Sequence, residues 1–433
     1  MNICSLAVAN LRTAPLTTAT NVLLLGLGLA ALLILFLVSR QVTEAVTRDA
    51  AGVDLVIGAK GSPVQLVLSS LYHADVPTGN IPLAEAQRWM DDIDVAMAIP
   101  LALGDTYRGH RIVGTTPDYI GLYNGHVATG RAWQAPMELV IRADVAARHG
   151  LKPGDSIVGA HGLSDLSEHH HDHPYEVVGV LARTGTVLDR VLVTGVESVW
   201  AVHGQAHHRH EGDDHEDDDH TDVAHEHEHE HKAHGQDADH DHADTDAAEA
   251  DNAEITAVLI RYRSPLAATR LPMAIQRQSG LQAAAPPVEL ARVLRIVGAG
   301  LDGLRAFAVL LLVVAAFSVF VALYNALKAR QVDIAVLRCL GATRFDVLCL
   351  LLIEGLLLAA GGILVGLLLG HGGVALAGQW LADSGSLRPD PWAFYPAEAL
   401  LLATTIALSM LAALLPAMQA YRTDVADTLS RDA

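Results

Sequence analysis

Histidine is the residue whose distribution first suggests chemistry in this sequence. Of its 23 histidines, 18 lie between His161 and His242, among many aspartates and glutamates. Neutral imidazole binds Zn²⁺, Cu²⁺ and Ni²⁺ well, and carboxylates add oxygen ligands. The region contains no cysteine or methionine, so zinc or a similar divalent metal fits it better than Cu⁺. The predicted metal ligands are His169, His170, His171, His173, His207, His208, His210, His215, His220, His225, His227, His229, His231, His234, His240 and His242.

The segment 203–254 also carries most of the acidity of the chain. It holds 19 acidic residues against Arg209 and Lys232, whereas the rest of the chain has 30 acids and 27 bases. Because the segment has almost no apolar residues, it is predicted to be disordered without metal. Two interpretations stay open. It is either a metal-capturing or metal-sensing arm, with affinity falling below about pH 6.5, or a solvated polyanionic loop that tolerates histidine.

The repeat at 225–231 contains two formal matches to the metalloprotease motif H-E-x-x-H, at His225–His229 and His227–His231. That motif needs a packed helix, and no apolar residues are present to pack one, so protease activity is not predicted. The isolated histidines are interpreted as structural or surface residues: His73, His110, His126, His149 and His371.

Four apolar runs are each long enough to cross a bilayer, which takes about 20 residues. Only the helix satisfies backbone groups in lipid, so each run is predicted to be a transmembrane helix. The first run has a longer apolar core than a signal peptide and no suitable cleavage site after Val38, and is therefore predicted to be an uncleaved anchor. The predicted spans are 16–38, 304–327, 347–369 and 399–417.

The distribution of lysine and arginine predicts the orientation of these spans. The loop between the second and third spans carries Lys328, Arg330, Arg338 and Arg344. The loop between the third and fourth spans has only Arg388, and the C-terminal tail has Arg422 and Arg431. Both termini are therefore predicted to be cytoplasmic, in the bacterial inner membrane, and the long segment between the first two spans is predicted to lie outside.

That long segment has the pattern of a mixed α/β domain, large enough without its acidic insert for two small lobes. Helical stretches are predicted at 83–90 and 143–148, and an amphipathic helix at 287–305 leads into the second span. The predicted strands are 53–57, 111–113, 139–141, 175–180, 190–193 and 257–262.

The fold class predicted is thus a membrane protein with four transmembrane α-helices and a mixed α/β extracytoplasmic domain between the first and second spans. The predicted order is a cytoplasmic N-terminus 1–15, span 16–38, extracytoplasmic domain 39–303 with insert 203–254, span 304–327, cytoplasmic loop 328–346, span 347–369, extracytoplasmic loop 370–398, span 399–417 and cytoplasmic tail 418–433.

Residues 328–362, KARQVDIAVLRCLGATRFDVLCLLLIEGLLLAAGG, contain a short charged helix, an LR-x-LGA-T-R core and an apolar helix with an early Glu354-Gly355. This stretch resembles the corresponding part of the FtsX/MacB-type ABC transporter permease family. The Leu415-Pro416-Ala417 and Tyr421–Asp424 segments look like the closing motif of that family, and the order of spans is similar. The histidine-rich insert departs from the family pattern.

The resemblance implies a dimer, with itself or a related permease, paired with a separate cytoplasmic ABC ATPase that alone binds ATP. It implies that the helix at 331–343 docks on that ATPase; the alternative is an ordinary basic juxtamembrane loop. The implied coupling residues are Leu337, Arg338, Leu340, Gly341, Ala342, Thr343 and Arg344.

Several sequence features bear on this implication. No G-x-x-x-x-G-K-[ST] phosphate loop occurs in the chain, so an ATPase site of its own is not predicted. The spans carry almost no charge, and Glu354 is interpreted as a carboxylate capped by polar neighbours rather than an ion ligand. Glycines at 361, 362, 366 and 370 suggest close helix packing. No basic, aromatic-interleaved patch suggests nucleic acid.

The function predicted is that of an ABC permease subunit, without catalytic residues, that couples a separate ATPase to its extracytoplasmic domain in zinc or other divalent-metal import or homeostasis. Two alternatives stay open: a mechanotransmission permease for lipoprotein or small-molecule export, and an activator of a cell-envelope enzyme. A periplasmic metal-binding or adaptor protein and membrane lipid are the further partners expected.

Overall fold

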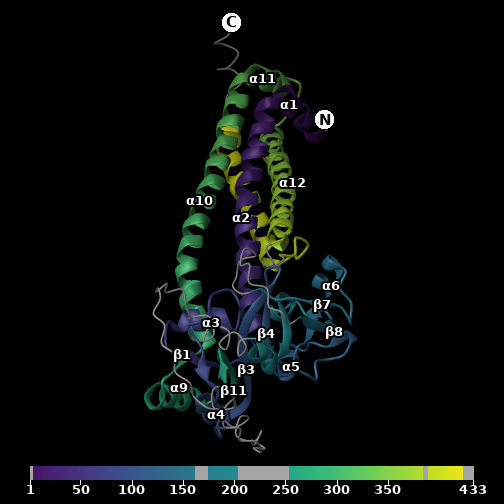
Figure 1. Cartoon of the computed structure of the whole chain (residues 1–433). Coiled ribbons are helices and arrows are strands. Elements are labelled where there is room, and N and C mark those ends of the chain that lie inside the picture. Colours follow the sequence, from purple (N-terminus) through teal and green to yellow (C-terminus); the bar gives the residue numbers. More distant parts are fainter. Residues whose placement is uncertain (1–2, 161–173, 203–252, 384–388, 423–433) are drawn as a thin grey trace, which may run out of the picture. The chain divides into compact units, whose positions relative to one another are not determined.

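The computed structural model describes residues 3–160, 174–202, 253–383 and 389–422 (Figure 1). The chain divides into two compact units. The helical unit comprises residues 1–45 and 294–433, and the sheet domain comprises Val46–Val293.

Six helices are described in or entering the helical unit. They are α1 (Ile3–Thr13), α2 (Pro15–Ala50), α10 (Pro286–Ala329), α11 (Gln331–Cys339), α12 (Arg344–Asp383) and α13 (Pro396–Arg422). Of these, α2, α10, α12 and α13 are long and apolar enough to cross a membrane. Together with the α/β domain between α2 and α10, they confirm the predicted fold class.

Three of the spanning helices are much longer than the apolar runs that predict them. Helix α2 has 36 residues, α10 has 44 and α12 has 40, so they extend about 54, 66 and 60 Å at 1.5 Å per residue. A hydrocarbon core about 30 Å thick covers only part of each. The amphipathic stretch predicted at 287–305 is the first part of α10, without a break before the apolar part.

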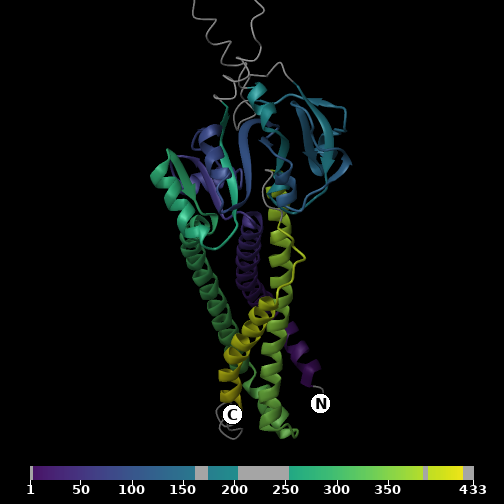
Figure 2. The ribbon, with the colours of Figure 1, turned by 90° about the horizontal axis from the view of Figure 1, so that it is seen from below.

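Glycines on α12 let helices of the helical unit pack closely. A Cβ added at Gly362 would lie 2.6 Å from the Cβ of Leu25 on α2, and one at Gly366 would lie 2.9 Å from that of Leu29. These spacings bring the two backbones together as small residues do in membrane helix pairs, as the glycine spacing predicted. Helix α13 packs against α12, and Figure 2 shows the two helices crossing.

The sheet domain is built on one mixed ten-stranded sheet, with strand order β12-β1-β11-β3-β4-β9-β6-β8-β5 and with β7 paired to β8. The pairs β4–β9 and β6–β8 are parallel. Its strands are β1 (Leu55–Ala59), β3 (Val95–Tyr107), β4 (His110–Thr115), β5 (Val127–Gly130), β6 (Glu138–Arg142), β7 (Ser156–Ile157), β8 (Tyr175–Leu181), β9 (Val191–Gly195), β11 (Ala257–Tyr262) and β12 (Leu281–Ala284); β2 (Ile81–Pro82) and β10 (Glu254–Ile255) form a separate pair.

Helices cover both faces of this sheet, as the alternation along β1 shows. Val56 joins a buried cluster with α3, whereas its neighbours Leu55 and Ile57 join a second cluster with α4 and α9. Successive strand residues point to opposite faces, so each apolar face receives its own layer. The helices of the domain are α3 (Pro63–Ser70), α4 (Leu83–Met90), α5 (Asp118–Leu122), α6 (Ala143–His149), η1 (Val187–Arg190, 3₁₀) and α9 (Ala267–Gln278), and residues 196–202 are also helical.

The division into two lobes expected from the length is not what the described residues form. The 13-residue strand β3 joins the halves of the sheet, because it pairs with β11 along 95–101 and with β4 along 101–107. Its register shifts between Leu103 and Thr106. One continuous sheet, and not two separate lobes, therefore carries the domain.

Candidate functional site

The predicted coupling segment is a short helix followed by a tight reversal. Helix α11 has Asp333 in its first turn and Arg338 in its last turn, charges that suit the helix dipole. It stops at Gly341, whose φ of +105° lies in the left-handed region. The Gly341 amide donates to the Arg338 carbonyl at 3.1 Å, and the Ala342 amide donates to the Leu337 carbonyl at 3.0 Å. This pair of bonds is a Schellman stop, which favours glycine.

The next helix starts two residues later with a reciprocal cap. The Thr343 amide and hydroxyl donate to an Asp346 carboxylate oxygen at 2.7 and 2.8 Å. The Asp346 amide returns a bond to the Thr343 hydroxyl at 3.2 Å. This arrangement is a capping box with aspartate in the place of glutamate. Gly341 and Thr343, both named from sequence as coupling residues, therefore fix the shape of the turn.

One face of α11 packs on the helical unit and the other is exposed. Ala335 is buried, and Ile334 packs against the cluster formed by Leu327, Val347, Leu351, Ala417 and Ala420. Val332, Val336 and Leu340 recur every fourth residue and are 47%, 48% and 80% exposed. We call these three residues the apolar stripe. An exposed apolar row beside a packed face is typical of a helix that contacts a partner.

The other predicted coupling residues lie around this stripe. Leu337, Arg338 and Ala342 are half-buried. Gly341, Thr343 and Arg344 are exposed, as is Phe345, which follows them. The family motif includes Leu340 but not Val332 or Val336. The spacing of four residues between these three apolar residues is the sequence signal from which all of them could have been predicted.

A buried carboxylate lies close to this segment. Glu354 of α12 is 2% exposed, and its Oε1 accepts a bond from the Asn10 side chain of α1 at 2.6 Å. Arg330, the residue just before α11, lies 3.7 Å from the same oxygen and donates to the Asn10 carbonyl at 2.9 Å. Polar neighbours therefore surround Glu354, as the sequence interpretation expected. The three residues join α1, the start of α11 and α12.

The predicted metal ligands from His169 to His242 all lie outside the described residues. Within 3–160, 174–202, 253–383 and 389–422, no group of three or more histidines, cysteines, aspartates or glutamates is placed to hold a metal ion. His371 is held by the Pro391 carbonyl, 2.7 Å from its Nδ1, and lies 3.4 Å from Glu398. Its surroundings agree with a structural role.

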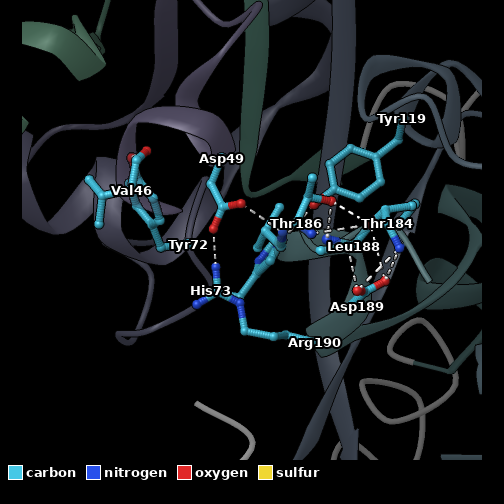
Figure 3. Close-up of polar contacts among 12 residues, drawn as sticks. Val46, Asp49, Tyr72, His73, Tyr119, Thr184, Thr186, Leu188, Asp189 and Arg190 are labelled. Atoms are coloured by element: carbon cyan, nitrogen blue, oxygen red, sulfur yellow. Dashed lines mark hydrogen bonds and ion pairs between the residues drawn. The ribbon is translucent and has the colours of Figure 1, made fainter. Parts of the chain in front are cut away.

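The sheet domain holds a buried polar cluster that sequence reasoning missed (Figure 3). Asp49, in the last turn of α2, accepts a bond from the Val187 amide at 3.0 Å and pairs with Arg190. The Tyr72 hydroxyl donates to the Val46 carbonyl at 2.8 Å, within the same turn. These partners lie far from Asp49 in sequence, so no local pattern could reveal them.

His73 completes the cluster next to Tyr72. Its φ of 51° lies in the left-handed region, and its Nε2 lies 2.9 Å from the Tyr119 hydroxyl. Burial, with the nearby positive charges of Arg111 and Arg190, lowers the pKa of His73 to about 3. The ring is therefore neutral at physiological pH, and burial raises the pKa of the Tyr72 and Tyr119 hydroxyls above their usual value.

Two family models match this chain. Residues 305–425 match the FtsX-like permease C-terminal domain, and residues 18–219 match the MacB-like periplasmic core domain. The chain belongs to the FtsX/MacB-type family of ABC transporter permeases. Permeases of this family lack an ATPase site of their own and work with cytoplasmic ATPases.

Solved structures also resemble the chain. The periplasmic region of MacB from Actinobacillus actinomycetemcomitans is 8% identical, with a TM-score of 0.33, and covers 57% of this chain and 97% of its own. The extracellular domain of the noncanonic ABC-type transporter YknZ from Gram-positive bacteria is 11% identical, with a TM-score of 0.29, and covers 53% and 98%. No curated protein matches the chain. The family assignment rests on the two family models.

Proposed function

We propose that this multi-pass membrane protein couples a separate cytoplasmic ABC ATPase to its sheet domain, as a mechanotransmission permease. The observation that carries the proposal is the apolar stripe of α11. Its outward face is free for a partner, and its inward face packs on residues of α10, α12 and α13. A force on the stripe would thus reach three spanning helices at once.

The connections of the long helices support the second half of the proposal. Helix α2 leads into β1 through residues 51–54, and β12 is followed directly by α10. Strands β1 and β12 pair with each other, with Val56 opposite Ala284. Both long helices are therefore attached to two neighbouring strands. A change in their relative position would act on one place in the sheet.

The orientation belongs to the same proposal. The basic residues between α10 and α12 favour a cytoplasmic position for α11 by the positive-inside rule. Both termini would then be cytoplasmic, and the sheet domain would lie outside the bacterial inner membrane. Glu354, held by Asn10 and Arg330, has the surroundings of a structural carboxylate and not of an ion ligand.

Photocrosslinking in native membranes tests the docking surface and identifies the partner. A photoreactive residue at Val336 or Leu340 should crosslink to a protein that contains an ABC ATPase sequence. The same residue at buried Ala335 should give only crosslinks within the chain. A matched control is exposed Ile93 of the sheet domain, 81% exposed, which should not capture an ATPase. Absence of an ATPase adduct at both stripe positions would contradict the proposal.

The histidine-rich segment supports a second, finer proposal, that the complex serves zinc or other divalent-metal homeostasis. The supporting observation is the concentration of 18 histidines between residues 161 and 242. Many tethered ligands at high local concentration can retain metal collectively. The segment would then capture metal from outside, with a periplasmic metal-binding or adaptor protein as a further partner.

Deleting 203–242 tests the metal proposal. Calorimetric zinc titration of the full chain should show the loss of most binding at neutral pH. A strain with the deletion should grow like its parent in zinc-replete medium and lag under chelation. An equal lag in both media would instead favour a role of the segment in partner binding, and no lag would favour a dispensable polyanionic loop.

A further inference from the structure

The last turn of α2 is fixed to the sheet domain by side chains as well as by the chain itself. Asp49 is 3% exposed and uses one carboxylate oxygen for the Val187 amide and the other for Arg190. The Tyr72 hydroxyl binds the Val46 carbonyl from another side of the turn. Figure 3 shows Asp49 between these two groups of partners. The end of α2 is thus held by side-chain hydrogen bonds and an ion pair in addition to its peptide link to β1.

Arg190 connects the end of α2 to a strand that is distant from β1. It is the last residue of η1, and β9 begins at the next residue. In the sheet, β11, β3 and β4 separate β9 from β1, the strand that continues α2. At about 4.8 Å between strands, the two attachments of the helix end are about 19 Å apart across the sheet. The peptide link alone would act only on β1 and on its neighbour β12.

The loop that carries Arg190 is stiffened by its own contacts. The Asp189 carboxylate accepts bonds from the Thr184 amide at 2.9 Å and the Gly185 amide at 2.7 Å. Thr186 accepts a bond from the Leu188 amide at 3.4 Å. None of these bonds involves α2. Displacement of Arg190 would therefore be passed to β9 and not absorbed by a soft loop.

We propose that Asp49 and Arg190 are positioning residues that transmit movement of α2 to β9, in parallel with the covalent path to β1. The inference rests on the proposed function, because it assumes that ATP binding by the partner moves α2. It adds a second route into the sheet. The nucleotide response of β9 and of the helical residues 196–202 after it would then depend on this ion pair.

Hydrogen exchange of the reconstituted complex tests the link. The full chain is combined with the ATPase identified by crosslinking, and uptake is compared between nucleotide-free and ATP-bound states. The wild-type complex should show a nucleotide-dependent difference in peptides covering β1 and β9. Asp49→Asn should lose the difference at β9 and keep it at β1, with stimulated ATP hydrolysis within twofold of wild type.

The matched control is Asp189→Asn. It weakens the same loop without touching α2, so it should keep the difference at β9. Arg190→Gln, which cuts the same pair from the other side, should reproduce the result of Asp49→Asn and decides the question if the latter does not fold. A difference at β9 that survives in both Asp49→Asn and Arg190→Gln would overturn the link. A wild-type complex with no difference at either strand would overturn the proposed function and the link with it.

Discussion

Different forces stabilise the interior of the helical unit and the interior of the sheet domain. In the helical unit, Gly362 and Gly366 let two helices approach closely, and single polar contacts such as that of Ser318 with Asn21 lie between the spans. In the sheet domain, large apolar clusters cover both faces of the sheet, and a buried polar network holds Asp49 and Tyr72. The contrast follows from the solvents that the two units face.

Lipid tails are as apolar as leucine, so spanning helices gain little from burying apolar surface against one another. Shape complementarity must then decide which helices pair. In water, apolar burial is strongly favourable, but each polar group buried with it needs a partner. The sheet domain is therefore expected to be sensitive to lost partners, and the helical unit to added volume. Each of the following predictions tests one side of this contrast.

The largest effect is expected from removing the partner of a buried carboxylate. Arg190→Leu leaves Asp49 without its counter-ion and should destabilise the sheet domain by about 3 kcal/mol, the lower end of the usual range because Arg190 is partly exposed. Pulse proteolysis of the full chain in urea measures this change in the free energy of unfolding. Arg131→Leu, which removes a surface pair with Glu138, is the control and should change little. Equal effects of the two substitutions would contradict the contrast.

Acid should weaken the sheet domain through His73. Its pKa is about 3 when folded and 6.5 when unfolded, so between these values only the unfolded chain binds the proton. Stability is therefore complete above pH 6.5 and is lost as pH falls, by about 3 kcal/mol from this group at pH 4.5. Asparagine tolerates the left-handed region, so His73→Asn should flatten this dependence. An unchanged pH slope in the variant would show that other groups dominate.

Added volume should disturb the helical unit more modestly. Gly366→Leu places a side chain against Leu29 and should cost about 1–2 kcal/mol through forced separation of α2 and α12. Unfolding in mixed micelles of increasing denaturing detergent gives the measurement. At Gly372 an added Cβ meets nothing within 4 Å, so Gly372→Leu is the matched control. Comparable destabilisation by both would argue against close packing as the organising force.

The smallest effect is expected at Glu354. Glu354→Gln keeps an acceptor for Asn10 and loses only the charge that faces Arg330, so the change in stability should stay below about 1 kcal/mol. Glu354→Ala removes the acceptor as well and should cost more. The same detergent unfolding assay compares them. Equal losses for glutamine and alanine would assign the stability to the charge and not to the acceptor for Asn10, which the geometry does not predict.

The fold was predictable wherever the signal is local. The apolar runs predict four helices because lipid leaves no alternative, and the run at 257–262 predicts β11 with both bounds. Strand β3 was missed because Pro100 and Gly104 disfavour strands. The sheet accommodates the proline, whose carbonyl accepts a bond from the Thr115 hydroxyl at 2.8 Å.

The candidate site was predictable only in part for the same reason. Gly341 and Thr343 were named because the segment at 337–344 resembles the family motif, and the turn and the cap that they form depend on neighbouring residues. Asp49 and Arg190 are 141 residues apart, and Asn10 and Glu354 are 344 apart. Such pairs depend on tertiary packing that one sequence does not encode in any local pattern.

ATP hydrolysis by the reconstituted complex tests the central claim most directly, that the apolar stripe of α11 couples this permease to its ATPase. Leu340→Glu places a charge at its most exposed position and should reduce stimulated hydrolysis at least tenfold, with the sheet domain still folded. Ile93→Glu, an equally exposed substitution in the sheet domain, should leave hydrolysis at the wild-type rate. Wild-type hydrolysis by Leu340→Glu, or an equal loss in Ile93→Glu, would contradict the account.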